Sequence, residues 1–415
     1  MDNLTHSLAG LFLGEVFYQY SLRNKKEDRK TSEKEEGVSS RRLFLTSSIV
    51  ANNFPDLDLL YSWILVKPLG YLLHHRGHTH TFITAIPQVL ILIAVLFYLW
   101  PQARNALSRD RLLLKQVFMT SVVGISFHIF LDSLNSFGVH PFYPFDSNWY
   151  YGDLLFIVEP FLWVIFGVSA AITFNNQKYK IVLISLILGL CVLLTMALLI
   201  SFYSLLALIV LACLLSLNFS PHDVQKAKRI SLGLAAFCFM SFLGVQCYFS
   251  NQSYKEIKKL LWLAPTEKLI DVALTPQAAN PFCWSFVSLV ENNSTFYQLK
   301  RGYLSILPSL IPTESCRIFG VTETGQKQSS VIWLGSETFE KKKLQKLSDE
   351  NCYFNAWLRF ARMPSFNEWG ATDLRYFSKE TENFSSLNFD SYSQKECPQL
   401  VPGWGYPRQD LLGKN

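Results

Sequence analysis

Three long apolar runs constrain this chain most strongly. They are "FITAIPQVLILIAVLFYLW" at 82–100, "IVLISLILGLCVLLTMALLI" at 181–200 and "ISLGLAAFCFMSFLGVQCYF" at 230–249, and none contains a formal charge. Each approaches the roughly 20 residues with which a helix crosses the hydrocarbon core of a bilayer. Only 17% of the 415 residues are charged, against about a quarter in soluble domains. The chain is therefore predicted to be a polytopic membrane protein.

Further segments extend this prediction. Two are moderately apolar, at 154–174 and 202–217, and three weaker ones contain His, Asp, Asn or Glu, at 4–22, 43–65 and 117–134. Ionisable groups at membrane depth usually mark a functional interior. We expect an all-α helical bundle of about eight membrane segments, in which residues 175–250 supply additional transmembrane helices.

Basic residues predict the orientation of the bundle. The expected loops 23–42, 101–116, 175–180 and 218–229 are rich in Lys and Arg, whereas 135–153 contains neither. Cytoplasmic loops have an excess of these residues, so eight alternating spans place both termini outside. The net charge of +6 is explained by these loops, and nucleic-acid binding is not indicated.

Residues 251–415 are predicted to form a soluble, extracytoplasmic α+β or β-rich domain, because charge is mixed and short β-like runs such as "CWSFVSLV" recur. Four of the eight cysteines lie there: Cys283, Cys316, Cys352 and Cys397. An even set in an oxidising compartment suits two disulfides, with three pairings possible. Four unrelated free thiols are the alternative.

Histidine and aspartate residues gather on the expected outer side. The stretch "HHRGHTHTF" contains four of the eight histidines. His128 and Asp132 are four residues apart and share one face of a helix. Asp56 and Asp58 follow Pro55, in an extended or turn geometry that lets both carboxylates reach one site. Imidazole and carboxylate are ligands of zinc, and manganese or iron also suits them. We therefore expect a metal site at the outer mouth of the bundle.

Simpler interpretations stand beside this one. His128 alone fits a core histidine bonded to a neighbouring helix, and Pro-Asp-x-Asp is often a helix-capping turn. Arg76 suits a clamp for phosphate or carboxylate. A salt bridge from Arg76 to one of the aspartates is an equal alternative.

The N-terminal half resembles bacterial inner-membrane proteins described as membrane-bound metal-dependent hydrolases. The matching pieces are "MDNLTHSLAG", "NFPDLDLL", "HRGHTHTF", "FHIFLDSLNSFGVHPFYPF" and "WYYGDLLFIVEP". These pieces span residues 1 to about 161, with Arg76 in the same motif as the metal ligands, and we expect residues 1–174 to form the membrane-embedded hydrolase region. The implied metal residues are His6, Asp56, Asp58, His75, His80, His128 and Asp132. Glu159 stands where relatives often have Asp. The family looks distantly similar to the zinc-dependent phospholipase C and single-strand nuclease group.

These features predict a hydrolase, with zinc as the expected cofactor, that acts on a phosphoester of a phospholipid or lipid-linked substrate at the outer face of the inner membrane. Asp58 or Asp153 orients a ligand histidine or serves as base, and Arg76 steadies charge on the phosphate. The alternative is a non-catalytic protein with a structural metal, whose residues 251–415 bind an envelope partner. A transporter is disfavoured, because 181–200, 202–217 and 230–249 contain no His, Asp, Glu, Lys or Arg.

Overall fold

The computed structural model describes residues 1–25, 33–217, 223–316, 325–376, 383–392 and 395–413. It divides the chain into two compact units. Unit 1 comprises Met1–Asp56, Thr79–Asp132 and Ile157–Gly244. Unit 2 comprises Leu57–His78, Ser133–Phe156 and Val245–Asn415. All of the sheet-forming segment after residue 251 therefore lies in unit 2, together with two segments from the first half of the chain.

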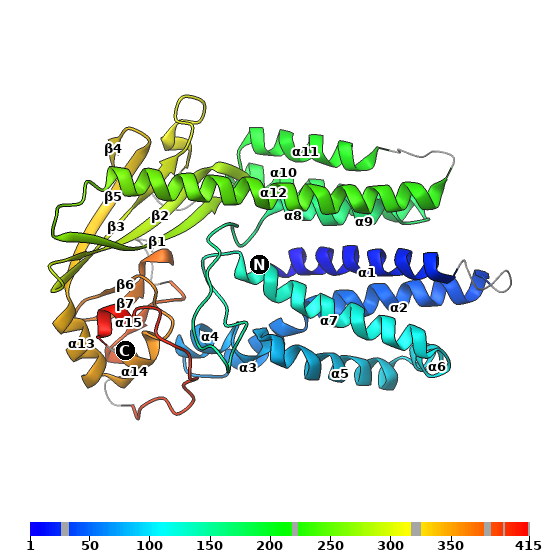
Figure 1. Cartoon of the computed structure of the whole chain (residues 1–415), viewed down its shortest axis with the longest axis horizontal. Helices are drawn as coiled ribbons and strands as arrows, with labels where there is room; N and C mark the ends of the chain where they lie inside the picture. Colours follow the sequence, from blue (N-terminus) through cyan, green and yellow to red (C-terminus); the bar gives the residue numbers. More distant parts are fainter. Residues whose placement is uncertain (26–32, 218–222, 317–324, 377–382, 393–394, 414–415) are drawn as a thin grey trace. The chain divides into compact units, whose positions relative to one another are not determined.

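Unit 1 is helical (Figure 1). Its elements are α1 (Asn3–Lys25), α2 (Glu33–Asn53), α5 (Phe82–Leu99), α6 (Pro101–Arg109), α7 (Arg111–Ser133), α8 (Pro160–Leu162), the π-helical turn η3 (Trp163–Val168), α9 (Ser169–Ile172), α10 (Gln177–Met196), α11 (Phe202–Ser216) and the first part of α12 (Val224–Leu260). Short 3-10 turns, η1 (Pro55–Asp58) and η2 (His78–His80), lie where the chain passes between the two units.

Within the described residues, four helices are long and apolar enough to cross a membrane: α5, α7, α10 and α12. Pro160–Ile172 and α11 are shorter apolar helices. The prediction of about eight membrane segments is therefore not supported. The predicted span at 43–65 breaks because α2 ends at Asn53, shortly before Pro55, which lacks the N–H that a continuing helix needs. The predicted span at 154–174 is short because its helix begins only at Pro160.

Glycines bring the helices of unit 1 close together. A Cβ on Gly10 would lie 2.7 Å from Cα of Ile49, and one on Gly14 would lie 2.9 Å from the carbonyl oxygen of Phe44. Gly10 and Gly14 are four residues apart, so they form one small-residue face of α1 against α2. A Cβ on Gly124 of α7 would similarly meet Asn52 Nδ2 at 2.9 Å. Helices α1 and α7 therefore both pack closely on α2.

Unit 2 contains the two sheets (Figure 1). The larger sheet is antiparallel with the strand order β1-β2-β3-β5-β4, and the smaller one has the order β6-β7-β8. The strands are β1 (Glu267–Gln277), β2 (Asn280–Asn292), β3 (Phe296–Ser305), β4 (Gln326–Gln328), β5 (Val331–Glu340), β6 (Pro364–Phe366), β7 (Gly370–Asp373) and β8 (Leu387–Asn388). The helices are α3 (Leu59–Ser62), α4 (Leu69–His74), α13 (Lys341–Glu350), α14 (Cys352–Trp357) and α15 (Gln409–Leu412). The predicted sheet-containing C-terminal region is confirmed.

Aromatic side chains and two disulfides stabilise unit 2. Trp357 and Trp404 are fully buried, and both belong to a core that also includes Leu72 and Leu73 of α4. The disulfides join Cys283 to Cys316 and Cys352 to Cys397. The expectation of two disulfides is confirmed, and the structure selects one of the three pairings.

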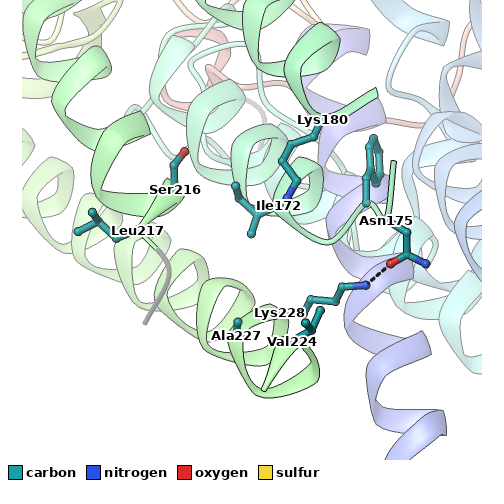
Figure 2. A pocket seen from close by; sticks show the side chains of 9 residues that line it. Ile172, Asn175, Lys180, Ser216, Leu217, Val224, Ala227 and Lys228 are labelled. Atoms are coloured by element: carbon teal, nitrogen blue, oxygen red, sulfur yellow. Dashed lines mark hydrogen bonds between the residues drawn. The ribbon is translucent and has the colours of Figure 1, made fainter. Parts of the chain in front are cut away.

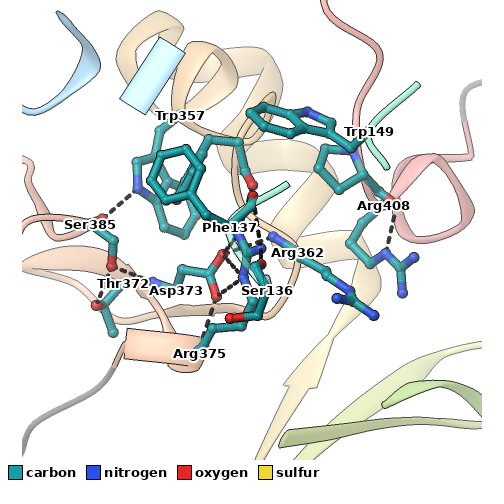
Figure 3. A network of polar contacts seen from close by, with 12 residues as sticks. Ser136, Phe137, Trp149, Trp357, Arg362, Thr372, Asp373, Arg375, Ser385 and Arg408 are labelled. Carbon is teal, nitrogen blue, oxygen red and sulfur yellow. Dashed lines mark hydrogen bonds and ion pairs between the residues drawn. The ribbon is translucent and has the colours of Figure 1, made fainter. Parts of the chain in front are cut away.

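Buried arginine–carboxylate pairs add a polar network to unit 2 (Figure 3). Arg375 Nη2 donates to Asp373 Oδ2 at 2.7 Å. Arg362 donates to both carboxylate oxygens of Asp271, at 2.8 and 2.9 Å. Bidentate pairs of this kind are stronger and more specific than single contacts. The Arg362–Asp271 pair joins residues 91 positions apart in the sequence.

Candidate metal centre

Four buried side chains of unit 1 converge at the ends of α2 and α7. Asp56 follows α2 in η1, His80 ends η2, and His128 and Asp132 lie one turn apart on α7. One ligand atom from each of the four lies within 4.8 Å of the others, and all four residues are buried. This arrangement brings together four of the seven residues for which a metal role was expected.

The donor atoms face one another at short range. His80 Nε2 lies 3.3 Å from Asp132 Oδ2 and 3.5 Å from Asp56 Oδ1. His128 Nε2 lies 3.5 Å from Asp132 Oδ2 and 3.6 Å from Asp56 Oδ1. Two imidazoles and two carboxylates thus point at one small volume, as in a site that holds a divalent ion.

The backbone of α2 sets the tautomer of His128. Its Nδ1 lies 2.6 Å from the carbonyl oxygen of Asn52, and a carbonyl only accepts, so Nδ1 carries the proton. Nε2 is then the atom with the free lone pair, and it faces His80 Nε2 at 3.0 Å. A hydrogen bond from one ring nitrogen to a carbonyl is the usual second contact of a metal-binding histidine. The Gly124 contact with α2 makes this approach of α7 sterically possible.

His6 lies at the edge of the cluster. Its Nε2 is 3.3 Å from Asp132 Oδ1, and its ring stacks on His128 with centroids 3.7 Å apart. The Met1 amine also donates to Asp132 Oδ1, so this carboxylate attracts positive charge. The four converging residues and His6 are here called the His/Asp cluster.

The cluster fits a divalent metal on its chemistry alone. Two carboxylates in a buried volume need compensating positive charge, because an uncompensated buried charge is costly. The Met1 amine supplies one such charge at Asp132, and a bound cation would supply the rest. Imidazole nitrogen and carboxylate oxygen suit zinc, manganese and iron, whereas they do not distinguish among them.

The other predicted metal residues, Asp58 and His75, lie in unit 2. His75 Nδ1 is 2.9 Å from Asp58 Oδ1, and the backbone N–H of Arg76 donates to Asp58 Oδ2 at 3.0 Å. The guanidinium of Arg76 donates to Asn135 Oδ1 at 2.9 Å and lies 4.8 Å from the centre of the Phe137 ring. Asp58 thus orients His75, as a carboxylate does behind a ligand histidine. The metal and phosphate roles of these three residues stay predictions.

Asp153 also lies in unit 2, where it pairs with Arg362 at 2.9 Å. Burial raises the pKa of the Asp153 carboxyl, and the Arg362 guanidinium opposes this shift. The same guanidinium holds the pKa of Asp271 below its ordinary value, although burial acts in the other direction. The observed contact of Asp153 is structural, and its role as a base stays a prediction.

The remaining polar residues of the motifs have other contacts. Glu159 caps α8 by accepting from the N–H of Phe161. His74 Nε2 lies 3.1 Å from the carbonyl oxygen of Leu400, and His78 is exposed beside Trp404. The sequence did not predict that Asn52 contacts the His/Asp cluster. Asn52 acts through its backbone carbonyl, which has no sequence signature.

Comparisons with known proteins agree with the membrane assignment. Residues 1–202 match the family described as YdjM inner membrane protein. The curated "Uncharacterized protein YfhP" of Bacillus subtilis (strain 168) is 24% identical over 142 residues, which cover 34% of this chain and 40% of that relative. The chain therefore spans less than half the length of this relative. No solved structure matches. The resemblance to bacterial inner-membrane proteins is confirmed for the N-terminal half, which contains the whole His/Asp cluster.

Proposed function

Residues 1–202 match the YdjM inner membrane protein family, and from this premise we propose that the protein is a metal-dependent hydrolase of the bacterial inner membrane. The main support is the convergence of Asp56, His80, His128 and Asp132 on one buried volume. Structural zinc sites are built largely from cysteine, whereas hydrolytic sites use histidine and carboxylate ligands. The His/Asp cluster contains no cysteine.

In the proposed site, His80 and His128 would hold the metal through Nε2, and Asp56 and Asp132 would hold it through carboxylate oxygens. A bound divalent metal supplies a water of lowered pKa and polarises the oxygen of the scissile group. The Asn52 carbonyl keeps His128 in the tautomer that presents Nε2. His6 contacts the other oxygen of Asp132, Oδ1, and steadies this carboxylate. Burial of the whole cluster strengthens each of these electrostatic contacts.

The proposed substrate is a phosphoester of a phospholipid or of a lipid-linked intermediate, handled at the outer face of the membrane. The integral membrane character of the chain supports a lipid substrate. The two disulfides of unit 2 support an oxidising compartment for the C-terminal region. The basic loops between the helices support the same orientation. Zinc remains the expected metal.

Metal content and turnover of the purified full chain test the proposal together. Wild type is compared in detergent with His128→Ala/Asp132→Ala, and His78→Ala serves as the matched control because it removes an exposed imidazole two residues from His80. The expected result is stoichiometric metal in wild type and control, loss of metal in the double variant, and metal-dependent hydrolysis of bis(p-nitrophenyl) phosphate or of a phospholipid panel.

Two results would overturn parts of this proposal. Stoichiometric metal without turnover on any member of the panel would reject the hydrolase and favour a structural metal in a partner-binding protein. The absence of bound metal in wild type, after purification with zinc, manganese or iron present, would reject the metal centre itself.

A further inference from the structure

A second polar site lies in unit 1, in a cavity of about 320 Å³ (Figure 2). Its lining comes from the ends of four helices and one loop: Ile172, Phe174, Asn175, Lys180, Ser216, Leu217, Val224, Ala227 and Lys228. These residues belong to the last turn of α9, the loop before α10, the first turn of α10, the end of α11 and the start of α12. The cavity is here called the helix-end pocket.

The charge of the helix-end pocket is positive. Its lining includes two lysines, Lys180 and Lys228, and no carboxylate among the described residues. Lys228 is only 7% exposed, and its ammonium donates to Asn175 Oδ1 at 2.6 Å. An ammonium has three donor hydrogens, so this contact leaves further donor capacity on a side chain that lines the pocket.

The nearby acidic residue does not neutralise these lysines. Glu15 acts electrostatically on Lys228, but Arg41 pairs with Glu15 at 2.9 Å. Lys180 and Arg41 also act on Lys228, with the same sign of charge. The balance of the four groups is therefore net positive.

The position of the helix-end pocket is that of a membrane boundary. Helix α10 has 20 residues and is therefore about 30 Å long, which matches the hydrocarbon core of a bilayer. The pocket opens at the N-terminal ends of α10 and α12, both of which are apolar enough to span. Exposed apolar side chains, including Ile181, Val182 and Leu214, continue along α10 and α11. A polar cavity thus adjoins a surface suited to acyl chains.

We propose that the helix-end pocket binds the phosphate of an anionic phospholipid, with the acyl chains lying along α10 and α11. Lys180 and Lys228 supply the charge, and Ile172, Leu217 and Val224 supply the apolar walls. Basic pockets between membrane helices recognise anionic headgroups in this way. This site is separate from the His/Asp cluster and does not depend on hydrolysis.

Native mass spectrometry of the full chain, extracted in mild detergent with added lipid, tests the proposal. Wild type should retain phosphatidylglycerol in preference to phosphatidylcholine, and Lys180→Gln/Lys228→Gln should bind phosphatidylglycerol roughly tenfold or more weakly. The matched control is Lys178→Gln/Lys226→Gln, which removes two exposed lysines at the same helix ends that do not line the pocket. The control should keep the wild-type preference.

A second variant keeps the test independent of the folding of the lysine variant. Ala227→Trp fills the cavity without changing charge and should also abolish the preference for phosphatidylglycerol. An equal loss of phosphatidylglycerol binding in the Lys178→Gln/Lys226→Gln control would overturn the proposal, because it would show that lipid binding depends on the overall basic charge of the helix ends and not on the pocket. Full retention of the phosphatidylglycerol preference in Ala227→Trp would overturn the proposal as well. Displacement of the lipid by millimolar inorganic phosphate would show that the pocket recognises free phosphate, and would reject the lipid as its ligand.

Discussion

His80 and His128 face each other through their Nε2 atoms at 3.0 Å, and the Asn52 carbonyl fixes the proton of His128 on the other ring nitrogen. The Nε2 lone pair of His128 therefore points at His80 and at the two carboxylates beside it. Two states account for this close approach of the Nε2 atoms. In one, a proton is shared between the two rings, and in the other a metal ion lies among the four side chains. These two states differ in a measurable way, since only the metal needs all four residues.

Substitution of His80 by Ala should weaken metal binding of the full chain by about tenfold to a hundredfold, because it removes one of four converging ligands. Substitution of His78 by Ala should leave metal binding unchanged, because that side chain is exposed and outside the cluster. Competition with a chromogenic chelator measures both affinities. Equal affinities in the two variants would contradict the assignment of His80.

Substitution of Gly10 by Ala should destabilise unit 1 and weaken metal binding. The added Cβ would lie 2.7 Å from Ile49 Cα and 2.8 Å from the Ser48 carbonyl oxygen, so α1 must move from α2 and take His6 with it. Gly189→Ala is the control, because nothing lies within 4 Å of a Cβ there and alanine favours helix by about 1 kcal/mol. In detergent, the unfolding temperature of Gly10→Ala should therefore lie below that of wild type, and that of Gly189→Ala should be equal to wild type or higher.

Substitution of Arg362 by Met should destabilise unit 2 by about 3–5 kcal/mol, because it leaves the buried Asp153 without its guanidinium partner and leaves the half-buried Asp271 with Arg408 alone. Asp153 and Asp271 are the carboxylates concerned. Lys327→Met breaks the exposed pair with Glu314 and should change stability little. Tryptophan fluorescence during thermal unfolding measures the stability of both variants. Similar losses of stability in Arg362→Met and Lys327→Met would refute a special role for the Arg362 pairs.

The contribution of Asp271 to the stability of the fold should decrease as the pH falls. Arg362 lowers its pKa in the folded state, so ionised Asp271 stabilises the fold above the ordinary aspartate value of about 3.9. This stabilisation is lost as the pH falls through the lower, folded-state pKa. The stability difference between wild type and Asp271→Asn should thus be constant near neutral pH and shrink below about pH 4. A difference that grows on acidification would contradict the assignment.

Loss of the Cys352–Cys397 disulfide should destabilise unit 2 by about 4 kcal/mol in the chain-entropy account, because it closes a loop with a sequence separation of 45. The test is the Cys352→Ser/Cys397→Ser variant, followed by thermal unfolding with and without reductant. Cys213→Ser is the control, since this free cysteine is exposed in α11. Reductant should destabilise wild type and the control by more than the disulfide variant, which keeps only the Cys283–Cys316 bond.

Several features of this protein were determined by local sequence. The uncharged apolar runs specify membrane helices, because length and hydropathy alone decide whether a helix can cross a bilayer. The four-residue spacing of His128 and Asp132 places both on one face of α7, since helical periodicity needs no partner. The number of disulfides followed from the even number of cysteines outside the apolar runs.

Other features depended on tertiary packing. The predicted count of about eight membrane segments is not supported by the described residues, because hydropathy cannot show where α2 ends or that the helix at Pro160 is short. The cysteine pairing, the Asn52 carbonyl behind His128, and the pairing of Asp153 with Arg362 join residues distant in the sequence. The helix-end pocket is assembled from several helix ends for the same reason. Contacts of this kind depend on how α1, α2 and α7, or the strands of unit 2, pack together, and no local pattern encodes that packing.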